Sequence, residues 1–154
     1  MTGRKYIVVL LTLALLALSF GAVGAQTVDP LPVVEDFFTW YLDTAGYDEA
    51  SGEFRNPLAD GSYQERPELA PSLIEAVMRS RDEEGGFFYD PFLCAQDVPV
   101  SVNFEVVGPD SVLVTMFFAW NPRPHTLLAR VDDAGLIGAI LCRETATARG
   151  TVET

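Results

Sequence analysis

The fold is decided by residues 98–120, VPVSVNFEVVGPDSVLVTMFFAW, where apolar and polar residues first alternate. Side chains of a β-strand point to opposite faces with a period of two, so the alternation predicts a strand over residues 100–106. Gly108-Pro109-Asp110-Ser111 then predicts a turn. Residues 112–120 are apolar at nearly every position, which is typical of a strand that is central in a sheet or covered on both faces. The stretch therefore predicts an antiparallel pair of strands.

The sequence leaves two registers open for this pair. A two-residue turn aligns Phe104 with Thr115, whereas a one-residue bulge aligns the Val102 face with the more apolar face of the second strand. We favour the bulge, because it brings the more apolar faces of the two strands together.

Two further strands follow. Asn121-Pro122-Arg123-Pro124 predicts a turn, and residues 125–131 predict the next strand. Asp132-Asp133-Ala134-Gly135 predicts another turn, which leads into a strand over residues 136–142. We expect Trp120 to lie in the core or in a pocket wall, and His125, beside the predicted turn, to be in solvent. A polar tail, residues 145–154, ends the chain.

Helical periodicity precedes the strands. Between Pro32 and Ala45, apolar residues recur at i, i+3, i+4, i+7 and i+8. A second helix is predicted from Pro71 to the pair Gly85-Gly86. Residues 47–67 contain turn signals and are long enough to hide a short strand or a helical turn. This order predicts an α+β domain, in which N-terminal helices pack on a curved antiparallel sheet of about four strands with a pocket at its open end.

The first 25 residues predict where the protein works. Two basic residues precede an apolar run, residues 7–18, and small residues then lead to Ala25. This is the pattern of a secretory signal, and we expect cleavage after Ala25. The alternative is an uncleaved anchor, because residues 7–25 are just long enough to span a bilayer. Cleavage leaves residues 26–154 as one exported domain, periplasmic or extracellular, with no stable membrane anchor.

The mature chain is strongly acidic. Removal of Arg4 and Lys5 leaves 8 arginines against 22 acidic residues, a net charge of −14. Phosphate binding needs a cationic stripe, so nucleic acid is excluded as a partner. The acidity favours solubility, or attraction to a cationic partner. We predict no metal site and no cofactor, because the acidic residues are scattered without the spacing of a calcium loop.

Two cysteines, Cys94 and Cys142, lie in the exported part of the chain. An oxidising compartment favours a disulfide, and no other cysteine competes for either partner. The bond would close a loop of about fifty residues and stabilise the fold by roughly 4 kcal/mol in the chain-entropy model. The alternative is a catalytic cysteine, which would need the single histidine, His125, as its base.

Three segments carry a resemblance to a known family. They are residues 37–42 (FFTWYL), 89–97 (YDPFLCAQD) and 137–142 (IGAILC). Together they resemble the DUF3828 family of exported bacterial proteins over roughly residues 32–143. One departure is Leu136, where such proteins often have a tryptophan. The resemblance implies an NTF2-like, cystatin-like α+β fold, and it implies no activity, because the activity of that family is unassigned.

Residues 89–97 are also the predicted site. The segment leaves the second helix, is held at Cys94 and leads into the first strand, so we expect it at the end of the sheet, where pockets with a few polar groups form. Aromatic side chains of the first helix supply a wall. The predicted ligand contacts are Trp40, Tyr41, Tyr89, Asp90, Gln96 and Asp97. The alternatives are structural: the aromatic residues pack in the core, and the polar residues cap backbone groups.

We predict an exported, non-catalytic domain that binds a small molecule, a peptide or a protein at the open end of the sheet, because the sequence contains no complete catalytic set. One alternative is an inhibitor or immunity-type protein, whose acidic surface would block a basic enzyme. Another is an enzyme that uses Asp90 or Asp97 with Tyr41 or Tyr89 as acid and base, which would need a carboxylate desolvated inside the pocket. The apolar second face of residues 112–120 leaves a homodimer possible.

Overall fold

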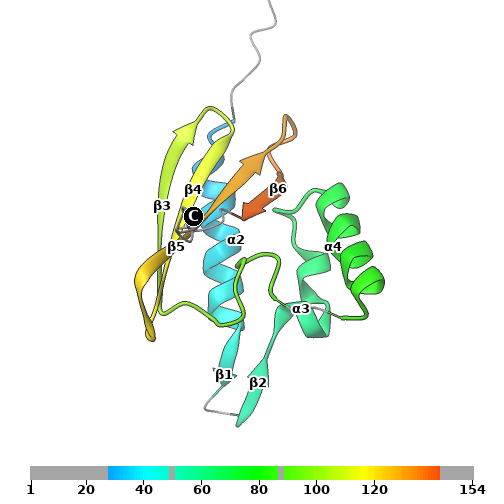
Figure 1. The fold of residues 1–154 in the computed structure, drawn as a ribbon. Helices are drawn as coiled ribbons and strands as arrows, with labels where there is room; N and C mark the ends of the chain where they lie inside the picture. The colour runs from blue at the N-terminus through cyan, green and yellow to red at the C-terminus, as the bar shows by residue number, and fades with distance from the viewer. Residues whose placement is uncertain (1–27, 49–50, 87–88, 143–154) are drawn as a thin grey trace, which may run out of the picture.

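The computed structural model describes residues 28–48, 51–86 and 89–142 (Figure 1). It is an α+β structure, as predicted, with helices packed against a four-stranded antiparallel sheet of order β3-β4-β5-β6. The predicted signal sequence and the polar tail lie outside the described residues. Among the helices of the described part, none is long and apolar enough to cross a membrane. The elements in chain order are α2 (Pro30–Thr44), β1 (Gly46–Asp48), β2 (Glu53–Arg55), α3 (Pro57–Asp60), the 3₁₀ helix η1 (Ser62–Glu65), α4 (Pro71–Glu84), β3 (Ser101–Gly108), β4 (Ser111–Phe118), β5 (Asn121–Val131) and β6 (Ile137–Cys142).

Helix α2 is the centre of the core. The side chain of Asp29 caps it by accepting a hydrogen bond from the backbone N–H of Leu31 at 3.1 Å, and Pro30 occupies the first turn, where its missing N–H costs nothing. The helix lies along the sheet and contacts β3, β4 and β5 (Figure 1). One face is buried, and it consists of Val34, Phe37, Phe38 and Tyr41. The predicted helix is confirmed, and it begins two residues earlier than expected because of this cap.

The register of β3 and β4 contains the predicted bulge. Gly108 pairs with Ser111 across the turn, but the pairing shifts by one residue at Val107, so that Phe104 pairs with Val114 and not with Thr115. The bulge thereby puts Val102 and Phe104 of β3, which pack against the core, on the same face of the sheet as the apolar face of β4. Val112, Val114 and Met116 of that face are fully buried, so the register that brings the more apolar faces together is confirmed.

The predicted turn at residues 121–124 is wrong. Strand β5 already begins at Asn121, which pairs with Phe118, so the turn between β4 and β5 falls on Ala119 and Trp120. The next pair is Met116 with His125, which leaves three residues of β5 opposite one of β4. Both prolines of the expected turn lie in this bulge, where a missing N–H breaks no regular ladder bond.

This shift of the turn decides the places of two aromatic residues. Trp120 lies at the tip of the β4–β5 hairpin and is 66% exposed, so it is not in the core but in a pocket wall, the other place that the sequence predicted for it. His125 is part of a strand and half-buried instead of being in solvent beside a turn. Its Nε2 atom is buried and has no hydrogen-bond partner among the described residues.

The stretch between α2 and α4 contains short strands and helical turns, as its length predicted. Strands β1 and β2 form a small hairpin that projects from the end of α2 (Figure 1). Asn56 then caps α3, because its side-chain oxygen accepts hydrogen bonds from the backbone N–H groups of Leu58 at 2.9 Å and Ala59 at 3.3 Å. This cap fixes Phe54, Asn56 and Leu58 opposite the segment that connects α4 to the sheet.

The second face of the sheet carries a row of leucines. Leu113 of β4 pairs with Leu128 of β5, which pairs with Leu141 of β6, and Leu141 is 45% exposed. An apolar row on a sheet face is typical of a surface that another molecule covers. The homodimer stays a prediction.

Candidate functional site

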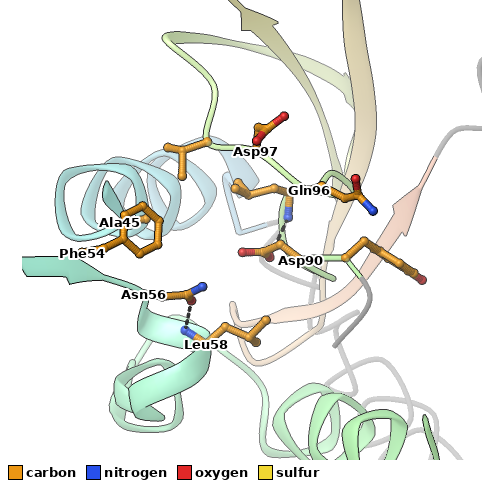
Figure 2. Close-up of a pocket in the computed structure, with 10 residues that line it drawn as sticks. Ala45, Phe54, Asn56, Leu58, Asp90, Gln96 and Asp97 are labelled. Atoms are coloured by element: carbon orange, nitrogen blue, oxygen red, sulfur yellow. Dashed lines mark hydrogen bonds between the residues drawn. The ribbon is translucent and has the colours of Figure 1, made fainter. Parts of the chain in front are cut away.

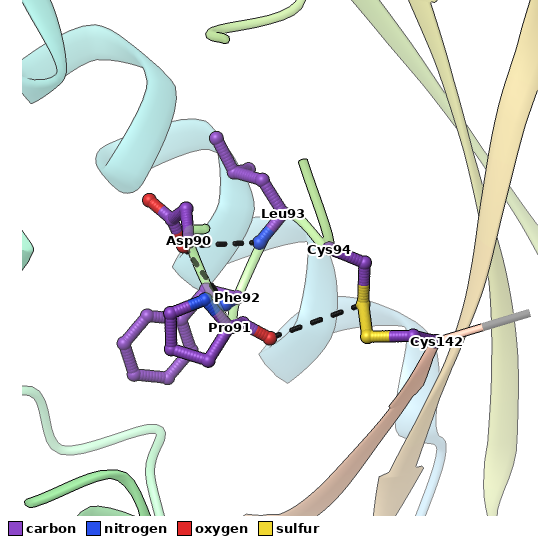
Figure 3. The surroundings of a disulfide bond; sticks show 6 residues. All are labelled: Asp90, Pro91, Phe92, Leu93, Cys94 and Cys142. Carbon is purple, nitrogen blue, oxygen red and sulfur yellow. Dashed lines mark hydrogen bonds between the residues drawn. A yellow bond between two sulfur atoms is a disulfide. The ribbon is translucent and has the colours of Figure 1, made fainter. Parts of the chain in front are cut away.

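The segment from Tyr89 to Val98 connects α4 to β3 and folds back on itself. The backbone N–H of Asp90 donates to the carbonyl of Ala95 at 2.7 Å. The carboxylate atom Oδ1 of Asp90 accepts hydrogen bonds from the backbone N–H groups of Phe92 at 2.8 Å and Leu93 at 3.1 Å (Figure 3). Asp90 therefore stabilises the folded-back shape of the segment. It forms hydrogen bonds with three backbone groups, which in an open loop would have only water as partner.

A disulfide ties this segment to the last strand. Cys94 and Cys142 are bonded, with their Cα atoms 5.5 Å apart, as the sequence predicted (Figure 3). Cys142 is the last residue of β6, so the bond joins the middle of the segment to the end of the sheet. The alternative of a catalytic cysteine is thereby wrong in this state of the protein, because neither sulfur is a free thiol.

Side chains of helix α2 contact this segment and hold it in place. The hydroxyl of Tyr41 donates a short hydrogen bond to Oδ2 of Asp90, and Tyr41 is fully buried. The ring of Phe92, also fully buried, packs within 5.3 to 5.5 Å of the rings of Phe37, Tyr41 and Tyr63. The segment is thus fixed by one carboxylate, one aromatic ring and one disulfide.

Burial changes the titration of both partners of the hydrogen bond. Burial raises the pKa of Asp90 above its usual value, while the hydrogen bonds from Tyr41, Phe92 and Leu93 oppose this rise. Burial, together with the charge of Asp90, raises the pKa of Tyr41 far above that of a free phenol. Tyr41 therefore keeps its proton and acts as a hydrogen-bond donor throughout the range of pH in which proteins fold.

The raised pKa of Asp90 makes a prediction about stability. A carboxyl group whose pKa is higher in the folded state contributes stability that is fully present below its unfolded value, about 4, and is lost as the pH rises through the folded value. We expect the difference in free energy of unfolding between the wild type and Asp90→Asn to fall as the pH rises above about 4. Urea unfolding across a pH series measures it, with the exposed Asp43→Asn as the matched control. A difference that grows with pH would mean that the three hydrogen bonds outweigh burial.

A cavity of about 270 Å³ lies over Asp90. We call it the Asp90 cavity. Figure 2 shows the carboxylate of Asp90 and the amide of Asn56 facing each other across it. Its polar lining consists of Asn56, Tyr89, Asp90, Gln96 and Asp97, and its apolar lining consists of Ala45, Phe54, Leu58, Leu93 and Val98.

The structure brings four of the six predicted contacts together in this cavity, namely Tyr89, Asp90, Gln96 and Asp97. Trp40 lines a neighbouring, more open cavity of about 680 Å³, and the guanidinium of Arg66 stacks 4.2 Å above its ring. Tyr41 lies beneath the Asp90 cavity and reaches it only through Asp90. The predicted aromatic wall is supplied by Phe54 instead, which lines both cavities and is 65% exposed.

Sequence reasoning missed the five lining residues outside residues 89–97, namely Ala45, Phe54, Asn56, Leu58 and Val98. A signal for one of them existed in Asn56-Pro57, because an asparagine before a proline is typical of a helix cap. Nothing in the sequence pattern said that this cap would face residues 89–98, since the two segments are more than thirty residues apart.

The Asp90 cavity offers both hydrogen-bond acceptors and donors, because its carboxylates accept, while Asn56 uses its oxygen to cap α3 and keeps its NH2 group as a donor. Carboxylate and amide groups line it, and no lysine or arginine does so among the described residues. Asp90 already accepts three hydrogen bonds, so it is a fixed acceptor with little freedom to move a proton. The described part of the chain also contains no group of three or more histidine, cysteine or acidic side chains that could hold a metal ion.

No family model matches the chain, and no curated protein and no solved structure matches it either. The argument for a function therefore depends on the geometry of the site.

Proposed function

We propose that the protein is an exported, non-catalytic binding domain that takes a small molecule, or an exposed group of a peptide or protein, in the Asp90 cavity. One observation carries the proposal. Four polar or aromatic residues of one connecting segment line a cavity whose central carboxylate is held by Tyr41 and by two backbone N–H groups. Pockets with apolar walls and a few fixed polar groups are the usual form of a binding site.

Preorganisation supports this proposal. Ordering a flexible loop on binding costs free energy that lowers affinity. Here the disulfide at Cys94 and the hydrogen bonds of Asp90 already order the segment. A ligand that enters the cavity meets acceptors whose positions are set, so its binding energy is not spent on folding the loop.

The proposal also includes export of the protein and its membership of the DUF3828 family. The disulfide supports export, because such bonds persist in oxidising compartments. Helices that precede a four-stranded antiparallel sheet and pack on one of its faces support membership of the DUF3828 family with its NTF2-like fold.

An acid–base enzyme is the second candidate function. The observation that favours it is the raised pKa of Asp90, a carboxyl group inside a cavity. The hydrogen bonds of Asp90 weigh against it, because Oδ1 accepts two backbone N–H groups and Oδ2 accepts the buried Tyr41 hydroxyl. The inhibitor alternative is supported by the acidic composition alone.

The proposal predicts that two substitutions weaken binding without unfolding the protein. Gln96 and Asp97 are exposed residues of the cavity wall. Loss of one polar contact to a ligand typically costs about 1 to 3 kcal/mol, so Gln96→Ala or Asp97→Asn should weaken binding roughly 5-fold to 150-fold. Native mass spectrometry of the protein purified from its source identifies the retained ligand, and calorimetry then measures the affinities.

The matched control is Asp133→Asn, which removes the same charge in the exposed turn between β5 and β6. It should leave both affinity and melting temperature unchanged. If Gln96→Ala and Asp97→Asn lower the melting temperature but leave the affinity of the folded protein unchanged, both residues are structural and the proposed site is wrong.

A further inference from the structure

A third cavity shares Gln96 and Asp97 with the Asp90 cavity. It also has a volume of about 270 Å³, and it lies between the disulfide and the tip of the β4–β5 hairpin. We call it the Trp120 cavity. Its lining combines the cysteine Cys94 and the rings of Phe118, Trp120 and His125 with the side chain of Asp97.

Three rings meet at this cavity. The ring centroids of Phe118 and Trp120 are 5.7 Å apart, and those of Phe118 and His125 are 6.4 Å apart. Trp120 is nevertheless 66% exposed, so much of the indole surface lies in water. The bulge that contains Pro122 and Pro124 produces this arrangement, because it moves the turn onto Trp120 and draws His125 into the strand. Bulges often re-aim side chains in this way beside functional sites.

The charge around these rings is negative. Asp97 is the one carboxylate among the lining residues, and no lysine or arginine lines the cavity in the described part of the chain. The mature chain carries a net charge of −14, which raises the local concentration of cations. An open indole face beside a carboxylate is the arrangement that attracts organic cations, because the face of the ring is itself negative.

One buried polar atom of His125, its Nε2, lacks a hydrogen-bond partner among the described residues. A buried polar atom without a partner costs free energy. A hydroxyl group could be this partner in either tautomer, since it both donates and accepts.

We propose that the Trp120 cavity is a second binding site, which takes an organic ammonium group over the ring of Trp120 and against the carboxylate of Asp97. The two cavities share Gln96 and Asp97, but Phe118, Trp120 and His125 belong to the Trp120 cavity alone, so a substitution at Trp120 tests this site without altering the lining of the Asp90 cavity.

The test compares choline with its neutral isostere, 3,3-dimethylbutan-1-ol, which has the same shape and hydroxyl group but no charge. Nuclear magnetic resonance of the full mature chain follows the two indole N–H signals, which a Trp120→Leu variant assigns. We expect choline to shift the Trp120 signal in a saturable way and to leave the Trp40 signal in place. We expect the neutral alcohol to bind more weakly than choline. Equal affinities, or no saturable shift with choline, would overturn the proposal.

Variants test the two named contacts. Trp120→Leu should weaken choline binding about 2-fold to 30-fold, the range of a cation–π contact, as measured from the amide signals of residues 94–97. Asp97→Asn should weaken it about 5-fold at low salt and less at high salt. Asp133→Asn is again the control. If Trp120→Leu keeps the full affinity for choline, the ring is not part of the site and the proposal fails.

Two sources of the ammonium group remain to be separated. Choline represents a free small molecule, and the amide of Nα-acetyl-trimethyllysine represents a side chain of a peptide. Tighter binding of the first probe indicates a small ligand, and tighter binding of the second indicates a peptide. Phe54 lines the Asp90 cavity but not the Trp120 cavity, so Phe54→Ala should leave choline binding unchanged whether or not the proposed function is right.

Discussion

Removing the disulfide, by Cys94→Ala together with Cys142→Ala, should lower the free energy of unfolding by roughly 4 kcal/mol. The two cysteines are 48 residues apart, and the cross-link restricts the unfolded chain by an amount that grows with the length of this loop. The double substitution avoids leaving a free thiol that could form bonds between molecules. Guanidinium unfolding of the oxidised wild type and of the double variant measures the difference.

A second measurement separates the disulfide from the packing of the two side chains. Reduced wild type should unfold at nearly the same denaturant concentration as the double variant, because both lack the cross-link and keep a small side chain at each position. The segment between Tyr89 and Val98 should also lose protection from hydrogen exchange in both. Equal stability of oxidised and reduced wild type would show that Asp90 and Phe92 hold the segment without help.

Phe92→Ala should destabilise the fold by about 3 to 5 kcal/mol. Phe92 is fully buried and lies against three aromatic rings, Phe37, Tyr41 and Tyr63, so its truncation leaves a cavity at the base of the site. Thermal and chemical unfolding measure the loss. Phe92→Leu fills most of the volume and should cost much less.

The control for this prediction is Phe54→Ala, at a phenylalanine that is 65% exposed. Substitutions of exposed residues usually change stability by less than about 0.5 kcal/mol. The loss of free energy of unfolding should therefore be several-fold larger in Phe92→Ala than in Phe54→Ala. A loss below about 1 kcal/mol in Phe92→Ala would mean that the rings around it close the gap, and that Phe92 does not anchor the segment.

The sequence predicted the features that follow from local pattern or from a small number of candidates. The two helices, the bulge before Gly108 and the strand that becomes β3 follow from short stretches of sequence, and they are confirmed. The disulfide needed no geometry, because only one pair of cysteines exists in the chain. Residues 89–97 were identified as a site segment because they join two elements and contain one of those cysteines.

The errors came from competition between local and long-range preferences. Asn121-Pro122-Arg123-Pro124 has the composition of a turn, but the apolar residues from Leu127 onward must pair with β4 so that Leu127 and Ala129 enter the core. The pairing of β4 with β5 therefore extends past the two prolines, which lie in a bulge of β5. The sequence could not place Phe54 and Asn56 at the site, because their position depends on how the β1–β2 hairpin packs against a distant loop.

The disulfide also changes what the domain does under mechanical load. Residues 94 to 142 form a covalent ring that contains all four strands of the sheet. A force applied at the two ends of the chain passes through the sulfur atoms and bypasses the ring. About 160 Å of the contour length of the chain is therefore not extended by the force. The described residues before Cys94, which contain the helices and the β1–β2 hairpin, can be extended. A tethered molecule therefore keeps the four strands of the main sheet on a closed loop even when α2 is pulled away.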